Sequence, residues 1–253
     1  MNYHIVTLFP EAIKPYLDAS ILGRAQASKL INVSYYNLRK YTKDKHRRTD
    51  GPAYGGGPGM VLWVDPVINS TSKIQSNIHK KYEKAKSAAA RSFGVTKKKL
   101  LKPKILYVLF TPEKTEFNNQ IAKQVSAKYT DIIFICGRYE GVDARVKQIL
   151  GAVEWSVGPY VLTGGEIPAM ICVDAISRHI KGVLHAEDSV EENRVSSHDV
   201  YARPEVYEHK TKTKTKSGEV KVKVKKHKVP TVLLSGNHKL IQEWRVANNI
   251  TNC

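Results

Sequence analysis

The stretch Ile132-Ile-Phe-Ile-Cys-Gly-Arg-Tyr-Glu-Gly141 decides the fold, because an apolar run passes directly into a loop bounded by two glycines. An apolar run of this length and composition is typical of a buried strand. A glycine directly after the strand lets the backbone approach a ligand closely. The stretch therefore predicts a strand of a parallel sheet whose carboxyl end carries a ligand-binding loop.

Similar apolar runs lie on both sides of this stretch, and each predicts another strand. Between them lie amphipathic stretches that predict helices, one of which begins at Pro10-Glu11. Alternating strands and helices predict an α/β fold with a mostly parallel sheet. The predicted strands are Tyr3–Phe9, Leu30–Leu38, Ile105–Phe110, Ile132–Cys136 and Trp155–Val157, and further helices are predicted near residues 116–128, 142–150 and 165–180.

Two further loops follow predicted strands in the same way. Val157-Gly-Pro-Tyr-Val-Leu-Thr-Gly-Gly165 follows one strand and Thr111-Pro112 follows another. Because the carboxyl ends of parallel strands meet at one edge, these loops and Gly137–Gly141 favour a shared small-molecule pocket.

The segment Tyr54-Gly-Gly-Gly-Pro-Gly-Met60 does not have dinucleotide-binding spacing. It predicts close approach of backbone to a ligand or phosphate, with a plain tight loop as the alternative.

The formal net charge of +18 resides in two segments. Residues 73–104 hold eleven Lys and Arg against one Glu, and residues 209–228 hold nine Lys against one Glu. Their surpluses of ten and eight together equal the net charge of the chain. We interpret both segments as basic insertions that attract a polyanion. A solvated, solubilising surface is the alternative.

Polar residues 185–199 show no apolar periodicity and predict a mobile linker. They separate a first domain, residues 1–184, from a small and mainly helical second domain, residues 200–253. In the second domain, TKTKTKSGEVKVKVK alternates with period two and predicts a β-hairpin insertion over residues 209–228. We expect Thr and Val on one face of this hairpin and Lys on the other. A disordered tail is the alternative. A helix is predicted over His238–Asn248, with Asn237 as its cap.

Other features exclude several classes of protein. The first residues show no signal-peptide pattern, and no apolar stretch reaches the roughly 18 residues of a membrane helix. The cysteines Cys136, Cys172 and Cys253 form no CxxC pair, so we expect neither disulfides nor a zinc site. The sequence predicts a soluble, cytoplasmic protein that does not associate with membranes.

Taken together, seven motifs resemble the bacterial tRNA (guanine-N1)-methyltransferase family of the SPOUT class. They occur in the family's order and cover nearly the whole chain except the two basic insertions. The motifs are Leu8-Phe-Pro-Glu11, Tyr54-Gly-Gly-Gly-Pro-Gly-Met60, Gly137-Arg-Tyr-Glu-Gly-Val-Asp143, Glu154-Trp-Ser-Val-Gly158 with Tyr160-Val-Leu-Thr-Gly-Gly-Glu166, Glu187-Asp-Ser189, Arg203-Pro-Glu205 and Val232-Leu-Leu-Ser-Gly-Asn-His238.

The resemblance implies a trefoil-knotted domain that binds S-adenosylmethionine, and an obligate homodimer whose active sites are built from both chains. It implies methyl transfer to N1 of guanosine 37 of tRNA, next to the anticodon. Mg²⁺ stays open as a second cofactor, although no ligand cluster in the sequence requires a metal. The implied cofactor-binding residues are Phe110, Thr111, Pro112, Gly137, Arg138, Tyr139, Glu140, Val157, Gly158, Pro159, Tyr160, Val161, Leu162, Gly164 and Gly165.

The resemblance assigns the general base to Asp188 and a supporting arginine to Arg178. The chain departs from the family at Pro159, where Asp is usual, so a carboxylate and a backbone N–H are lost from the pocket wall. The implied tRNA-binding residues are Arg47, Asp50, Gly55, Gly56, Gly57, Gly59, Ser189, Arg203, Ser235, Asn237 and His238.

Two other functions stay open at this point. One is a different SPOUT methyltransferase that acts on another RNA base or on ribose. The motif Glu187-Asp188-Ser189 argues against ribose, because ribose methylation would not need that base. The other is a non-catalytic RNA-binding module that uses the basic charge.

Overall fold

The computed structural model describes residues 1–91, 102–184, 199–214 and 220–248. The chain divides into two compact units, Met1–His185 and Ala186–Cys253, and each is described by itself. The predicted linker, residues 185–199, lies outside the described residues except for its last residue. Within the described ranges, no helix combines the length and the apolar character needed to cross a membrane.

The core of the first unit is a five-stranded sheet in which all neighbouring strands run parallel. The spatial order is β2-β1-β6-β5-β7. The prediction of an α/β fold with a mostly parallel sheet is therefore confirmed, while the trefoil knot stays a prediction. The strands are β1 (Asn2–Thr7), β2 (Asn32–Asn37), β5 (Ile105–Glu116), β6 (Asp131–Ile135) and β7 (Val153–Ser156).

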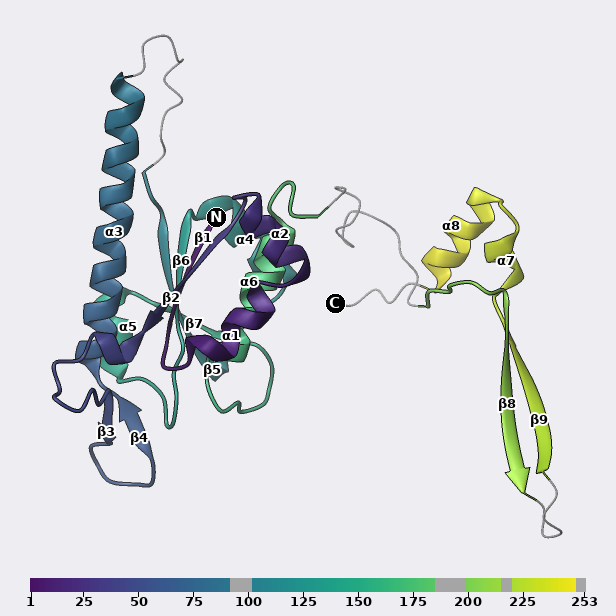
Figure 1. Cartoon of the computed structure of the whole chain (residues 1–253), viewed down its shortest axis with the longest axis horizontal. Helices are drawn as coiled ribbons and strands as arrows, with labels where there is room; N and C mark the ends of the chain where they lie inside the picture. Colours follow the sequence, from purple (N-terminus) through teal and green to yellow (C-terminus); the bar gives the residue numbers. More distant parts are fainter. Residues whose placement is uncertain (92–101, 185–198, 215–219, 249–253) are drawn as a thin grey trace. The chain divides into compact units, whose positions relative to one another are not determined.

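Helices cover both faces of this sheet (Figure 1). Ile132 and Phe134 of β6 pack with one group of helices, whereas Ile133 and Ile135 pack with the other, and all four side chains are fully buried. Burial on both faces explains why the strand reads as a continuous apolar run. The first group is α1 (Pro10–Leu17), α2 (Ser20–Ala27), α4 (Asn119–Lys128) and α6 (Glu166–Arg178), and the second is α3 (Val64–Arg91) and α5 (Ala144–Leu150).

The first predicted basic insertion begins inside a core helix. Ile74 and Ile78 of α3 are buried in the cluster that covers the second sheet face. Beyond them α3 continues to Arg91, and Lys80, Lys81 and Lys84 are exposed. Residues 73–91 therefore extend a helix of the fold, and residues 92–101 lie outside the described residues.

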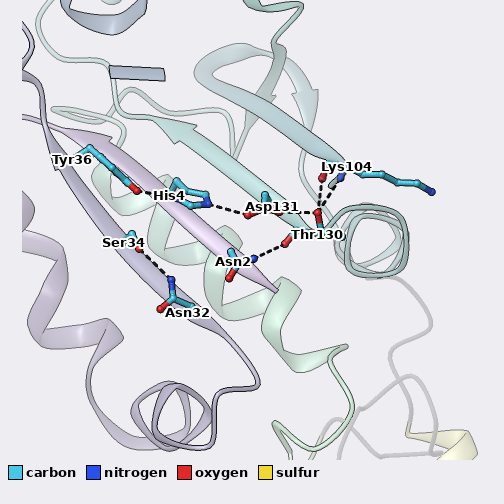
Figure 2. Close-up of polar contacts among 8 residues, drawn as sticks. All are labelled: Asn2, His4, Asn32, Ser34, Tyr36, Lys104, Thr130 and Asp131. Atoms are coloured by element: carbon cyan, nitrogen blue, oxygen red, sulfur yellow. Dashed lines mark hydrogen bonds and ion pairs between the residues drawn. The ribbon is translucent and has the colours of Figure 1, made fainter. Parts of the chain in front are cut away.

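A polar network joins four strands of the sheet (Figure 2). The His4 ring lies between Tyr36 and Asp131, with Nε2 3.1 Å from the Asp131 carboxylate and Nδ1 3.3 Å from the Tyr36 hydroxyl. The Thr130 hydroxyl donates to the second oxygen of Asp131 at 2.7 Å. The Lys104 N–H donates to the Thr130 hydroxyl at 2.9 Å, so the network reaches the start of β5. These contacts tie β2, β1, β6 and β5 together at one edge.

The second unit contains the hairpin of β8 (Val206–Lys214) and β9 (Val220–Lys228), followed by α7 (Thr231–Leu234) and α8 (His238–Ala247). Asn237 caps α8, because its side chain accepts from the N–H groups of Lys239 at 3.1 Å and Leu240 at 3.2 Å. The Trp244 ring of α8 lies 6.4 Å from the Tyr201 ring. Residues 215–219, between the two strands, lie outside the described residues.

The register of the hairpin overturns one prediction. Thr211 pairs with Lys223, and Lys212 pairs with Val222. Directly paired residues of an antiparallel ladder share a face, so Thr and Lys share one face while Lys and Val share the other. The prediction of a single lysine face is wrong. The physical reason is repulsion, because placing all lysines on one face would put like charges directly opposite each other.

Candidate active site

A cavity of about 400 Å³ lies at the carboxyl ends of β6 and β7 and beside the irregular middle of β5. The loops after β6 and β7 line it, as expected where parallel strands end together. The third wall, Phe110–Pro112, lies inside β5, which continues to Glu116, so the prediction that Thr111-Pro112 forms a loop after the strand is wrong. Every predicted cofactor-binding residue except Pro159 lines this cavity. Gly141 and Thr163, from the loops predicted to form the pocket, also line it. The lining residues that were not predicted are Leu109, Val142, Glu154, Trp155, Ser156 and Pro168.

The loop after β7 is shaped by a glycine and a tyrosine. Gly158 has φ +148°, and a Cβ there would overlap the Tyr160 ring. The Tyr160 hydroxyl donates to the Val157 carbonyl at 2.8 Å, which folds the ring back over the loop. The Gly158 N–H donates to the buried Ser156 hydroxyl at 3.2 Å, and this hydroxyl lies 3.2 Å from the Pro112 carbonyl. Ser156 thereby joins the loop after β7 to the irregular middle of β5.

The loops after β6 and β7 are fastened to each other by backbone. The Gly165 N–H donates to the Gly137 carbonyl at 2.9 Å, and Arg138 forms an isolated antiparallel bridge with Gly164. A Cβ on Gly165 would lie 2.7 Å from the Cα of Cys136, so a side chain at Gly165 would push the two segments apart. Glycine is required at this position because the two backbone segments lie too close together for a side chain.

A buried ion pair anchors the loop after β6. Arg138 Nε lies 3.0 Å from Glu166 Oε2, although the two atoms lack hydrogen-bond alignment. The Thr7 hydroxyl donates to the other Glu166 oxygen at 2.6 Å, and the Arg138 guanidinium lies 4.6 Å from the centre of the Phe9 ring. Glu166 is 4% exposed and opens α6, where a negative charge meets the positive end of the helix dipole.

The roles of Thr7, Phe9 and Glu166 were not predicted from the sequence. Phe9 and Glu166 occur in the quoted motifs, but only the fold brings them to Arg138.

Cys136, directly after β6, is fully buried, and burial raises the pKa of its thiol well above the usual value. We therefore assign Cys136 to packing and not to nucleophilic chemistry.

The glycine-rich segment of the first unit contacts Glu140, which lines the cavity. It joins β3 (Asp50–Pro52) and β4 (Met60–Leu62), and the Glu140 N–H donates to the Met60 carbonyl at 3.0 Å. A Cβ on Gly59 would contact the Glu140 carboxylate. Positive φ values occur at Arg47, Gly55, Gly56, Gly57 and Gly59. The structure thus brings this predicted tRNA-binding segment, with Asp50 at its base, beside the predicted cofactor residues.

The predicted catalytic residues lie apart from the cavity or outside the described residues. Asp188 and Ser189 belong to residues 185–198, which the structure does not describe. Arg178 is the last residue of α6, whereas the cavity touches Gly165 and Pro168 at the first turn. The ten residue steps from Pro168 to Arg178 correspond to roughly 15 Å along the helix axis. Within one chain, Arg178 therefore lies too far from the cavity to take part in chemistry there.

A shallow apolar groove of about 410 Å³ runs along the outer side of α6 and ends at Arg178. Ile167 and Ile171 in this groove are 47% and 40% exposed. The Tyr16 hydroxyl, on α1, donates to Asp174 of α6 at 2.6 Å. The groove is lined by Tyr16, Ile167, Met170, Ile171, Asp174, Ala175 and Arg178.

The remaining predicted tRNA-binding residues lie in the second unit. Arg203 precedes β8, and Ser235, Asn237 and His238 form the turn into α8. The Ser235 hydroxyl donates to the Val232 carbonyl at 2.7 Å and accepts from the Asn237 N–H at 3.2 Å. Hydrogen bonds between the Ser235 and Asn237 side chains and nearby backbone groups therefore hold this turn.

In the part of the chain that the structure describes, no group of three or more His, Cys, Asp or Glu side chains could hold a metal ion.

Comparison with known proteins gives a consistent result. The family model described as "tRNA (Guanine-1)-methyltransferase TrmD" matches residues 1–253. A tRNA (guanine-N(1)-)-methyltransferase of Clostridioides difficile is 38% identical over 254 residues, covering 99% of this chain and 93% of the relative. Relatives of the same name in Dictyoglomus turgidum and Lachnoclostridium phytofermentans are 39% and 36% identical, and the matches cover 97% and 99% of this chain and 83% and 87% of the relatives. The chain therefore belongs to the tRNA (guanine-1)-methyltransferase family.

Proposed function

We propose that this chain transfers a methyl group from S-adenosylmethionine to N1 of guanosine 37 in tRNA. The observation that carries the proposal is the glycine-lined cavity at the carboxyl edge of the sheet, formed by the segments that match the family's motifs. Relatives that match nearly the whole chain are named tRNA (guanine-N(1)-)-methyltransferases.

The cavity suits S-adenosylmethionine in size and in charge. Its volume of about 400 Å³ falls within the range of small-molecule sites. Glu140 lines it and would attract a sulfonium cation, whereas Glu154 is already paired with Lys147. The Gly137–Gly141 and Val157–Gly165 segments would hold the cofactor through backbone groups that glycine leaves accessible. When bound, the cofactor supplies an electrophilic methyl group.

Asp188 would act as the proton acceptor. Guanine N1 carries a proton, and a carboxyl with an ordinary pKa of about 3.9 is too weak a base to remove it beforehand. The proton would therefore pass to the Asp188 carboxylate while N1 bonds to the methyl carbon, the methyl–sulfur bond breaks and neutral S-adenosylhomocysteine leaves. While the proton leaves and before the new bond is complete, negative charge would develop on O6 of the guanine, and the Arg178 guanidinium would stabilise it.

This role for Arg178 requires a second chain. Because Arg178 lies at the opposite end of α6 from its own cavity, we propose that Arg178 of the partner subunit completes each site. The apolar groove along α6, which ends at Arg178, is the surface that we assign to the homodimer interface. Burying exposed Ile167 and Ile171 there would stabilise the dimer.

The function is tested by methyl transfer from labelled cofactor to tRNA transcripts that carry G, A, C or U at position 37. We expect 1-methylguanosine only with guanosine at that position. The reaction is run with and without Mg²⁺, which measures metal dependence directly. Binding of the transcript without any methyl transfer would favour an RNA-binding module, and methylation of another base or of ribose would favour a different SPOUT enzyme.

The shared site is tested by mixing two defective variants, Gly164→Val and Arg178→Ala, at a cofactor concentration far below the Kd of the Gly164→Val cavity. If the partner subunit supplies Arg178, a mixed dimer contains one intact cavity facing one intact arginine. A 1:1 mixture that exchanges subunits should then recover about a quarter of the wild-type rate. If Arg178 served its own cavity, every chain in the mixture would carry a defect in its own site, and no activity would return.

A further inference from the structure

The hairpin of β8 and β9 carries cations on both faces. One face presents Lys210 and Lys212 of β8, paired with Val224 and Val222 of β9. The opposite face presents Lys223 and Lys225 of β9, paired with Thr211 and His209 of β8. We call these the even face and the odd face, after the residue numbers. In each pair a lysine lies opposite an uncharged or weakly charged side chain, which limits repulsion between strands.

Both faces are open to solvent. Every described side chain from Val206 to Thr213 and from Val222 to Lys228 is exposed, so α7 and α8 cover neither face. Figure 1 shows the two strands extending away from these helices within the second unit. Nine residues per strand correspond to a ribbon about 30 Å long. Lysines two residues apart on one face are about 7 Å apart along the strand.

This arrangement is unfavourable for a hairpin in isolation. An isolated two-stranded ribbon is marginally stable in water. Val222 and Val224 of the even face stay 52% and 45% exposed. One ion pair, Glu208 with Lys226 at 3.2 Å, offsets part of the positive charge of the even face. Opposite charge supplied from outside, on both faces, would remove most of the remaining repulsion.

From this register we propose that the hairpin passes between two phosphate-backbone segments of the tRNA, with one segment against each face. The RNA identity of the polyanion rests on the proposed function. A ribbon that lay flat on a single backbone segment would use only one face and leave the other pair of lysines in solvent. On the odd face, Tyr207 is 60% exposed and can stack on a base that lies beside the phosphates.

The test compares two matched variants of the full-length protein. Lys210→Gln with Lys212→Gln removes two charges from the even face, and Lys223→Gln with Lys225→Gln removes two from the odd face. The control, Lys123→Gln with Lys128→Gln, removes two exposed charges from α4. Binding to a tRNA transcript is measured over a range of salt concentrations, together with the rate of methyl transfer at saturating tRNA.

We expect each face variant to weaken tRNA binding about tenfold and to reduce the slope of log K against log salt by one to two units. The control should leave both quantities nearly unchanged. An effect from only one face would show a flat contact and overturn the proposal, as would no effect from either face. The rate at saturating tRNA should be unchanged in the control variant, whose lysines lie on α4 of the first unit. A wild-type protein that binds tRNA but transfers no methyl group would overturn the proposed function instead.

Discussion

The two edges of the central sheet use polar groups in opposite ways. At the carboxyl edge, glycine-rich loops surround a cavity of about 400 Å³ and leave backbone groups accessible. At the amino edge, a cleft of about 360 Å³ is lined by side chains, among them His4, Tyr36 and Asp131, that hydrogen-bond to one another. The two cavities thus have similar volumes, but one is lined by accessible backbone and the other by side chains that are already hydrogen-bonded.

This difference suggests that the carboxyl edge serves ligand binding and that the amino edge serves the stability of the fold. Polar atoms at the amino edge already have partners inside the protein, so removing one leaves the others buried and unsatisfied. At the carboxyl edge the absence of side chains creates the space, so adding a side chain should interfere with a ligand first. We therefore expect substitutions at the carboxyl edge to change binding and rate, and substitutions at the amino edge to change the free energy of unfolding.

The largest effect is expected from Asp188→Ala, which removes the proposed base for chemistry at the carboxyl edge. The rate of methyl transfer should fall about 10²–10⁴-fold. Calorimetry should show nearly unchanged affinity for S-adenosylmethionine, because the carboxylate is assigned to the guanine proton. Glu187→Ala is the matched control and should keep its rate. An Asp188→Ala variant with more than about a third of the wild-type rate would show that Asp188 is a linker charge.

The next effect concerns Gly164→Val. A Cβ at Gly164 would lie 2.5 Å from Arg138 Nε and 2.6 Å from Glu166 Oε2, so the valine must displace this ion pair. We expect a loss of about 2 kcal/mol of cofactor binding energy, roughly a 30-fold weaker Kd. Calorimetry on the folded variant measures it. Unchanged affinity would remove the Val157–Gly165 loop from the cofactor site.

A smaller effect, on the free energy of unfolding, is expected from Asp131→Ala at the amino edge. It leaves His4 Nε2 and the Thr130 hydroxyl without their carboxylate partner. The free energy of unfolding should fall by about 1–3 kcal/mol. Urea denaturation measures the loss, and a double-mutant cycle with His4→Ala separates the pair from its surroundings. The affinity for S-adenosylmethionine should not change. A tenfold loss of that affinity would break the separation between the two edges.

The smallest expected effect is on how the stability lost in Asp131→Ala depends on pH. Burial raises the pKa of Asp131, but hydrogen bonds from His4 and Thr130 outweigh it, so the pKa lies below its usual value. A carboxyl with a lowered pKa stabilises the fold fully above the unfolded value of about 3.9 and stops doing so as the pH falls through the folded value. The difference between wild type and Asp131→Ala should therefore be constant near neutral pH and shrink below about pH 4. A difference that grows on acidification would contradict the lowered pKa.

Sequence reasoning predicted the parallel sheet and the cavity because each depends on local pattern. The run Ile132–Cys136 is apolar throughout, and the glycines of Gly137–Gly141 follow it directly. It did not find the ion pair of Arg138 with Glu166 or the hydrogen bond from Thr7 to Glu166, because these partners stand 28 and 159 residues apart and only the fold joins them. Nor did it find the contact of Asp131 with His4, which are 127 residues apart.

The hairpin shows a different limit. Alternation with period two predicts a strand, but it does not fix which residues of two strands lie opposite each other. Whether Thr211 faces a valine or a lysine depends on a shift of one residue, and both arrangements preserve the alternation. Repulsion between lysines decides the outcome, and that term appears only when both strands are considered together.

The strand order has a consequence for synthesis on the ribosome. In the finished sheet β1 lies between β2 and β6, and Asn2 pairs with both Asn32 and Asp131. At about 5–20 residues per second, the ribosome delivers β6 roughly 6–25 seconds after β1. During that interval β1 can pair with β2 alone, and its other edge exposes the unpaired backbone groups that promote aggregation. Until β6 arrives, the unpaired edge of β1 is therefore a site where the growing chain would benefit from protection by chaperones.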